Sequence, residues 1–255
     1  MNVAPTDRNN RAIKSTADGE HLILRDASGT KSLRLLNMET GRSFIIRKAG
    51  NEFIMDFQPI KGNKVILLCD RKIIILRYFP QMSYSEHVHT STINLMPGQS
   101  DEFFLTLAVC KDDKDLAVAS YGAQNDLSRI ILYTVGEMGL TFRAFVNFSE
   151  MKIAKVLAMN WLGMFNKMNV LVALSHSSPS RLIVIAFDGE TARVVNLNQN
   201  HAGDQGMQED KKKGDEVVVV GKEVPLMKPI QLIRFGNSLY SSDVSAKLTK
   251  IFVKV

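Results

Sequence analysis

Short apolar runs, each bounded by turn residues, recur from the beginning of the chain to its end. The first unit has an Asp18-Gly19 turn followed by the runs His21–Leu24 and Ser32–Gly41. Leu33 and Leu35 alternate with their neighbours, as residues do in a strand with one buried face. Few segments show the spacing of an amphipathic helix. The pattern therefore predicts antiparallel strands joined by tight turns.

The same order of strands and turns recurs in three later units and, less regularly, in a fifth. The expected strands are Phe53–Phe57, Lys64–Cys69 and Lys72–Tyr78; Phe104–Cys110, Leu116–Tyr121 and Arg129–Val135; Val156–Trp161, Asn169–Ser175 and Arg181–Phe187; and Ile230–Phe235 and Leu248–Val255. The third strands of the first two units centre on Leu35 and Ile75, 40 residues apart. This spacing matches the ~40–45-residue period of four-stranded propeller blades.

We therefore expect an all-β fold: a β-propeller of about five four-stranded blades in an incomplete or open ring. The expected divisions are a flexible segment at 1–11, a propeller at 12–255 with blades near 12–50, 51–100, 101–150, 151–200 and 223–255, and a mobile insertion at 201–222. Met82–Ser100 is expected to be a second inserted loop, and Pro59–Asn63 a turn. The chain stops inside the apolar run Lys250–Val255, so we expect an open edge that a partner or further residues complete.

The first unit resembles a WD40 repeat. Ala17-Asp18-Gly19-Glu20 stands where that family has the turn between its first two strands, and Leu36-Asn37 stands where Trp-Asp ends the third strand before a Thr-Gly turn, here Thr40-Gly41. Phe187-Asp188 falls near the Trp-Asp position of a later unit. No unit contains the family's Gly-His dipeptide, and the single tryptophan, Trp161, lies in a different strand. The resemblance implies a propeller that binds other proteins.

A second likeness covers two internal stretches. Leu105–Val135, with its Leu-Ala-Val-Cys-Lys-Asp-Asp-Lys-Asp-Leu-Ala-Val-Ala-Ser sequence, is similar to the third-blade region of large WD-repeat proteins of cilia and flagella. The strands from Ala158–Trp161 to Leu182–Ile185 are also similar to those proteins. This likeness implies a cytoskeletal setting, such as an axonemal complex, and is not evidence of any activity.

Composition narrows the class of protein. Among 255 residues, 45% are hydrophobic and 23% charged, which excludes a mostly disordered chain. The longest apolar runs, such as Ile73–Leu76, are too short to cross a bilayer, so we expect no membrane insertion. The net charge of +6 is spread thinly, and the basic run Lys211–Lys213 is flanked by acidic residues, which argues against nucleic acid as a partner. Cys69 and Cys110 lie in apolar runs, which favours buried thiols and a cytoplasmic location, although one disulfide stays an alternative.

The templates of common catalytic sites are missing from the sequence. It contains no phosphate-binding Gly-x-x-x-x-Gly-Lys loop, no Gly-x-Gly-x-x-Gly, no His-Glu-x-x-His and no Gly-x-Ser-x-Gly. His87 and His89, beside Glu86, are the one arrangement with metal-ligand character, because strand residues two apart share a face. Ordinary histidines of a loop or edge strand explain this pair better. We therefore expect no catalytic residue, no cofactor and no metal.

Three other groups have a structural and a functional interpretation. Asp112, Asp113 and Asp115 lack the later ligands of a calcium loop and fit a turn that caps its own backbone. Ser178-Pro179, within the loop Ser177–Ser180, suits either a proline-directed kinase or a simple hairpin. The cluster around Trp161, with Met159, Met164 and Phe165, forms either a recognition patch or, as we favour, part of the core.

The sequence as a whole favours a non-enzymatic scaffold that holds protein partners in a multi-subunit complex, with no small-molecule substrate. A propeller in a ribonucleoprotein complex is one alternative, and it predicts a one-sided Lys/Arg patch and salt-sensitive binding. A propeller hydrolase is the other, and it predicts a central pocket lined by carboxylates or histidines.

Overall fold

The computed structural model describes residues 13–25, 32–47, 52–93, 101–124, 126–148, 155–165, 167–175, 181–195, 231–235, 238–242 and 248–251. The expected flexible segment at 1–11, the insertion at 201–222 and the loop Ser177–Ser180 lie outside these residues, and they stay predictions. No helix in the described part of the chain is long and apolar enough to cross a membrane.

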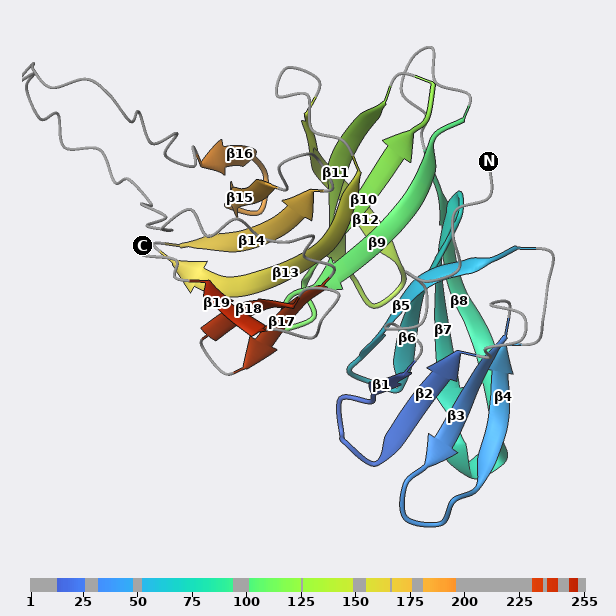
Figure 1. Ribbon diagram of the computed structural model, residues 1–255. Helices are drawn as coiled ribbons and strands as arrows, with labels where there is room; N and C mark the ends of the chain where they lie inside the picture. Colours follow the sequence, from blue (N-terminus) through green and yellow to red (C-terminus); the bar gives the residue numbers. More distant parts are fainter. Residues whose placement is uncertain are drawn as a thin grey trace, which may run out of the picture.

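Five antiparallel sheets follow one another along the described part of the chain, four of four strands and one of three (Figure 1). The strands of the first and second sheets are β1 Ile13–Ser15, β2 His21–Arg25, β3 Leu33–Asn37, β4 Ser43–Arg47, β5 Ile54–Ile60, β6 Lys64–Cys69, β7 Lys72–Phe79 and β8 Tyr84–Thr92. Those of the third and fourth are β9 Phe103–Val109, β10 Asp115–Gly122, β11 Leu127–Val135, β12 Leu140–Asn147, β13 Val156–Phe165, β14 Met168–Ser175, β15 Arg181–Phe187 and β16 Ala192–Val195. The fifth sheet contains β17 Gln231–Phe235, β18 Ser238–Ser242 and β19 Leu248–Ile251.

The sheets pack face to face in sequence order, which confirms the predicted propeller architecture. The first strands β1, β5, β9 and β13 contact one another in turn, and β13 contacts β17. Among the residues whose side chains are described, three hydrophobic cores fill the spaces between neighbouring sheets: one between sheets one and two, one between two and three, and one between three and four. Because a middle strand is covered by a neighbouring sheet on each face, it is apolar along its whole length. In β6, for example, every residue after Lys64 is buried.

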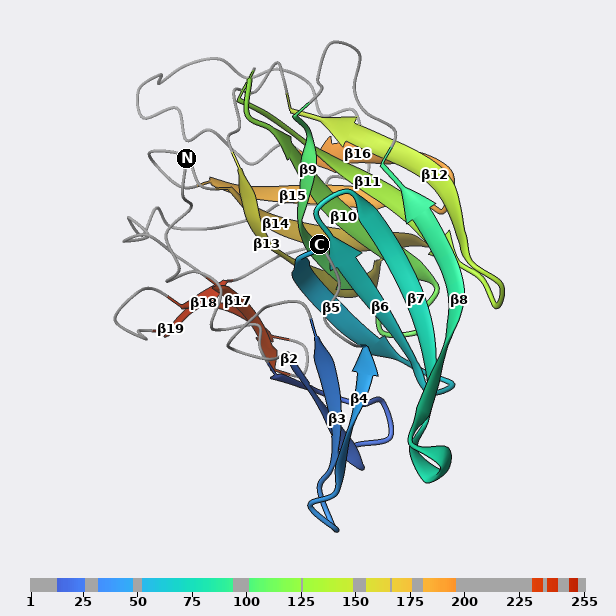
Figure 2. The ribbon, with the colours of Figure 1, turned by 90° about the vertical axis from the view of Figure 1, so that its right-hand side faces the viewer.

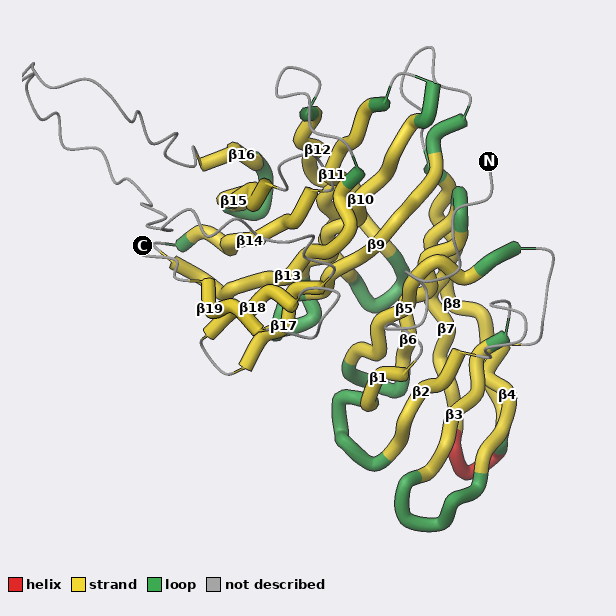
Figure 3. Tube along the Cα trace, in the orientation of Figure 1, coloured by secondary structure: helices red, strands yellow, loops and turns green. Residues whose placement is uncertain are grey.

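Two details differ from the sequence prediction. Met82–Ser100 is not simply an inserted loop, because it contains the nine-residue strand β8. This outermost strand is half exposed and rich in Ser, Thr and His, so its apolar pattern is weak. Pro59 belongs to β5 rather than to the following turn, and it is tolerated there because β5 is the edge strand of its sheet. In the described chain the only helix is the short 3-10 turn η2 Pro80–Met82, which joins β7 to β8 (Figure 3).

A buried carboxylate ties the first strands of three sheets together. Asp56 of β5 is 2% exposed, and its Oδ1 accepts a hydrogen bond from Lys14 Nζ of β1 at 3.1 Å. Its Oδ2 accepts from Thr106 Oγ1 at 3.1 Å and from the Leu107 backbone N–H at 3.2 Å, both in β9. Lys14 also donates to Gln58 Oε1 at 3.1 Å. Because Asp56 satisfies donors on both neighbouring sheets, it fixes the spacing of the inner strands.

We expect Asp56→Ala to lower the free energy of unfolding by about 3 kcal/mol, because it leaves buried donors of Thr106 and Leu107 without an acceptor. Urea denaturation followed by circular dichroism measures the change. The matched control is Glu86→Gln, which breaks the half-exposed pair of Glu86 with Arg77 and is expected to cost less than about 1 kcal/mol. Equal losses for the two variants would contradict the role of Asp56.

Candidate functional site

The hairpin turns of the first four sheets lie at one end of the strands, which we call the turn rim. It comprises the connections between β1 and β2, β3 and β4, β5 and β6, β7 and β8, β9 and β10, β11 and β12, β13 and β14, and β15 and β16. Successive strands reverse direction, so these connections share one end of each sheet. Figure 2 shows the β3–β4, β7–β8 and β11–β12 hairpins projecting along one side of the molecule, from the bottom to the right of the view.

Polar contacts join neighbouring sheets along the turn rim. The Lys61 backbone N–H, in the β5–β6 turn, donates to Asp113 Oδ2 of the β9–β10 turn at 2.9 Å. Asn169 Nδ2, at the start of β14, donates to Asp115 Oδ2 at the start of β10. These bonds hold turns of the second, third and fourth sheets next to one another, so the rim is a built surface rather than a set of independent loops.

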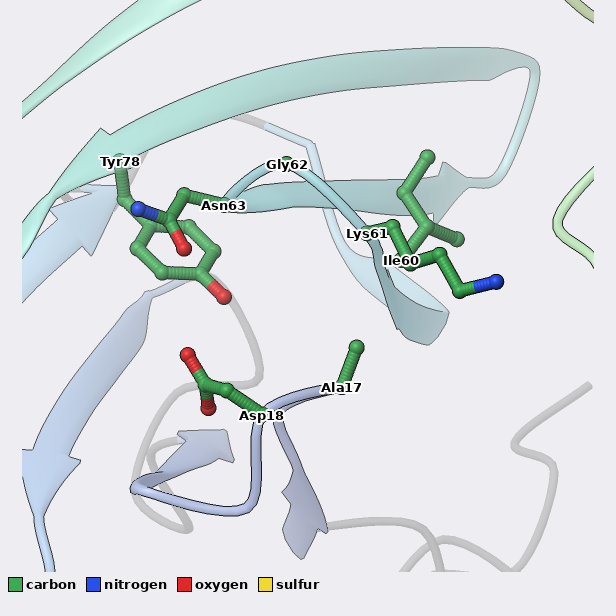
Figure 4. Close-up of a pocket in the computed structure, with 7 residues that line it drawn as sticks. All are labelled: Ala17, Asp18, Ile60, Lys61, Gly62, Asn63 and Tyr78. Carbon is green, nitrogen blue, oxygen red and sulfur yellow. The ribbon is translucent and has the colours of Figure 1, made fainter.

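A cavity of about 280 Å³ opens between the β1–β2 turn and the β5–β6 turn (Figure 4). It is lined by Ala17, Asp18, Ile60, Lys61, Gly62, Asn63 and Tyr78. Figure 4 shows the Asp18 carboxylate and the Tyr78 hydroxyl facing one another, while the Lys61 side chain directs its ammonium group away from both. Gly62 and Asn63 have φ values of +73° and +54°, a left-handed backbone that glycine and asparagine adopt most readily.

Tyr78 is a buried residue whose hydroxyl faces this cavity. The residue is 1% exposed, and its backbone N–H donates to the Asn63 carbonyl at 2.8 Å. Its hydroxyl forms no hydrogen bond with another residue of the described chain. Burial, and then the nearby negative charge of Asp18, raises the pKa of Tyr78 to about 12. Tyr78 is therefore a neutral phenol at physiological pH, and its hydroxyl can both donate and accept a hydrogen bond.

Asp18 supplies the negative charge of the cavity. Its Oδ1 accepts from Thr16 Oγ1 at 2.5 Å and from the Glu20 backbone N–H at 3.0 Å. The hydrogen bond from the Thr16 hydroxyl is the main reason that the pKa of Asp18 lies below its usual value. The group is therefore a carboxylate at neutral pH, and within the described chain its Oδ2 accepts no hydrogen bond.

One group of side chains near the cavity has the spacing of a metal site. It consists of Asp18, Glu20 and His21, whose potential ligand atoms all lie within 4.8 Å of one another. The hydrogen bonds around His21 disfavour one. Asn37 Oδ1 accepts from the Thr40 backbone N–H and hydroxyl, so its Nδ2 must be the atom that donates to His21 Nε2, at 3.2 Å. The lone pair of Nε2 is then engaged, and in the neutral ring the proton lies on Nδ1. His21 thus has no lone pair to offer a metal in this arrangement.

The other sequence-predicted candidates are distributed over the fold. A bulge in β8 pairs His89 with Ile75 and His87 with the next residue, Leu76, so the two imidazoles lie on opposite faces and do not converge on one ion. His87 contacts Thr90 Oγ1. The interpretation of Asp112 as a turn cap agrees with the structure: its Oδ1 accepts from Cys110 Sγ and from the Lys114 N–H.

The cluster around Trp161 divides between core and surface. Trp161 is buried and donates through Nε1 to the Ala108 carbonyl at 3.0 Å, and Met159 is buried beside it. Met164 is exposed. The side chain of Phe165 lies outside the described part of the structure. Cys69 and Cys110 are both buried free thiols, as predicted, and burial raises the pKa of Cys110 to about 12.

Sequence reasoning missed the cavity, although it identified the turns that form it. Asp18-Gly19 and Gly62-Asn63 are visible as turn signals, but their approach depends on how the first two sheets pack. Tyr78 is the end of an apolar run, and no local signal separates it from a core tyrosine. Its unused hydroxyl becomes evident only once the two turns are placed beside it.

A scan against protein-family models finds no match, and a comparison with curated proteins finds none either. Solved structures do match. A periplasmic gluconolactonase of Pseudomonas aeruginosa matches 71% of this chain with a TM-score of 0.54 and 12% identity, and the match spans about half (51%) of that protein. Hydrazine synthase of Kuenenia stuttgartiensis matches 94% of this chain and 82% of that one (TM-score 0.51, 9% identity). The β-propeller domain of Cps50 (Swd1) from Myceliophteria thermophila matches 96% and 83% (TM-score 0.50, 8% identity).

At these identities the likeness shows the fold, which is a β-propeller. The expectation that the chain is not an enzyme is wrong, because structures with this architecture include the gluconolactonase and hydrazine synthase. The inference failed because propeller enzymes assemble their sites from loops far apart in sequence, so the absence of short catalytic motifs excludes little. The WD-repeat and ciliary resemblances stay predictions.

We expect the Tyr78 phenol to remain protonated well above pH 10, when an ordinary tyrosine ionises. NMR of ¹³C-labelled tyrosine, assigned with Tyr78→Phe, measures its titration. A raised pKa means that the stability Tyr78 contributes is complete below about pH 10 and is lost as the pH rises toward about 12. Asp18→Asn should shift the titration downward, because a neutral amide no longer opposes phenolate formation. An ordinary titration near pH 10 in the folded protein would contradict the described burial.

Proposed function

We propose that this protein is a propeller platform that binds a protein partner through its turn rim. The observation that carries the proposal is a set of four exposed methionines at hairpin ends of this rim. They are Met38, Met82, Met138 and Met164, which are 57%, 73%, 82% and 65% exposed. Each belongs to a different one of the first four sheets, so the apolar side chains are distributed over the whole rim.

Methionine is suited to such a surface. Its unbranched side chain and polarisable sulfur adapt to irregular partners, and methionine is enriched in protein interfaces. Single exposed apolar side chains are common on protein surfaces, so the proposal rests on the shared end of the four sheets at which these methionines occur. The β5–β6 and β9–β10 turns are already held together by a hydrogen bond. These turns therefore lose little conformational entropy when a partner binds, which favours affinity.

The chemistry of the cavity also suits the binding of a ligand. The pKa of Asp18 is lowered and that of Tyr78 is raised to about 12, so each group keeps one protonation state at neutral pH. The similarity of Leu105–Val135 to ciliary and flagellar WD-repeat proteins supports a cytoskeletal complex as the setting.

We expect the double variant Met82→Lys/Met138→Lys to reduce co-purification of partners by roughly tenfold or more, because two apolar contacts are replaced by charges. Affinity purification of the full chain from its own cells, with quantitative mass spectrometry, measures the loss. Ile13→Lys is the matched control, since Ile13 is 61% exposed and lies at the start of β1, away from the β1–β2 turn.

Two results would overturn this proposal. One is an unchanged set of partners in the double methionine variant, provided that its circular dichroism spectrum and melting temperature match those of the unaltered protein. The other is an equal loss in Ile13→Lys, which would indicate general damage or a different binding surface.

A further inference from the structure

We propose that the cavity between the first two sheets holds a lysine side chain of the partner, with its ammonium group between Asp18 Oδ2, the Tyr78 hydroxyl and the Asn63 side-chain carbonyl. The inference rests on the partner-binding function above and adds the chemical group that the rim recognises. Three kinds of observation support it: the charge of the cavity, the number of unused acceptors and the apolar lining around them.

The charge of the cavity favours a cation. Asp18 carries a full negative charge, and the one basic residue of the lining, Lys61, turns its ammonium group away from Asp18 (Figure 4). The Tyr78 hydroxyl makes no hydrogen bond in the described chain, so it is available to a ligand that enters the cavity. An anionic ligand would meet the Asp18 carboxylate at close range and be repelled.

The acceptors suit an ammonium group better than a guanidinium group. Asp18 Oδ1 is already occupied by Thr16 and by the Glu20 N–H, so the carboxylate has one oxygen left. Arginine binds a carboxylate best through paired hydrogen bonds to both oxygens, and Asp18 cannot accept such a pair. An ammonium group has three donors on one atom and matches three separate acceptors.

The rest of the lining fits the stem of the same side chain. Ala17, Ile60 and the methylene groups of Lys61 complete the wall of the cavity. Lysine packs its four methylene groups along apolar surface while the charged end reaches polar groups. A divalent ion at Asp18, Glu20 and His21 is the competing cation, and the hydrogen bond from Asn37 to His21 Nε2 disfavours it.

The test is an NMR titration of the full-length protein with N-acetyl-lysine N-methylamide. We expect saturable shifts at Asp18, Asn63 and Tyr78, and weaker binding of the arginine analogue. Asp18→Asn should weaken binding about five- to tenfold, because it keeps the acceptor for Thr16 and Glu20 and removes only the charge. Tyr78→Phe should weaken it about threefold. Glu39→Gln, which removes an exposed acid from the neighbouring β3–β4 turn, should have no effect.

Several results would overturn the inference. One is that the norleucine analogue, which lacks the ammonium group, binds as tightly as the lysine compound. Another is that the lysine compound does not bind. A third is that Glu39→Gln weakens binding as much as Asp18→Asn does. Binding of Zn²⁺ or Ca²⁺ that is lost in Glu20→Gln, with no lysine binding, would assign the site to a metal. The two proposals can fail separately. If the double methionine variant loses its partners while Asp18→Asn retains all of them, the lysine site is wrong and the partner-binding turn rim still stands.

Discussion

The Asp56 carboxylate is the interaction on which the arrangement of the inner strands depends. It lies within β5 and accepts hydrogen bonds from Lys14 in the sheet before and from Thr106 and Leu107 in the sheet after. Hydrophobic packing alone allows sheets to slide, because apolar contacts have little directional preference. A buried carboxylate that must satisfy donors on two neighbours allows only one register between them. Lys14 and Gln58 complete the network on the side of the first sheet.

This register has a direct consequence for the turn rim. The strands that Asp56 aligns, β1, β5 and β9, run straight into the turns that carry Asp18, Asn63 and Asp113. Their alignment brings the β1–β2 turn against the β5–β6 turn to enclose the cavity, and brings Lys61 to Asp113. The rim is thus positioned by a polar network at the centre of the fold, while the methionines at its outer hairpins remain free for contact with a partner.

The sequence was sufficient to predict the middle strands, because β6, β10 and β14 are covered on both faces and are therefore apolar almost throughout. It was poorer at the outer strands. β8 is half exposed, so the sequence pattern predicts a loop there, and β18 has too few apolar residues to be recognised. The bulge that separates His87 from His89 leaves no local signal, so the sequence alone predicts that the two histidines share a face. The Asp18–Tyr78 cavity depends on how the sheets pack against one another, and the periodicity of apolar residues in the sequence does not predict that packing.

Hydrogen–deuterium exchange of the protein with and without its co-purified partner tests the central claim most directly. We predict that the partner protects the hairpin ends of the turn rim, including 16–20, 61–63 and 136–139, and leaves the connections at the opposite ends of the strands unchanged. Protection confined to those opposite connections, with the turn rim exchanging as in the free protein, would contradict the account.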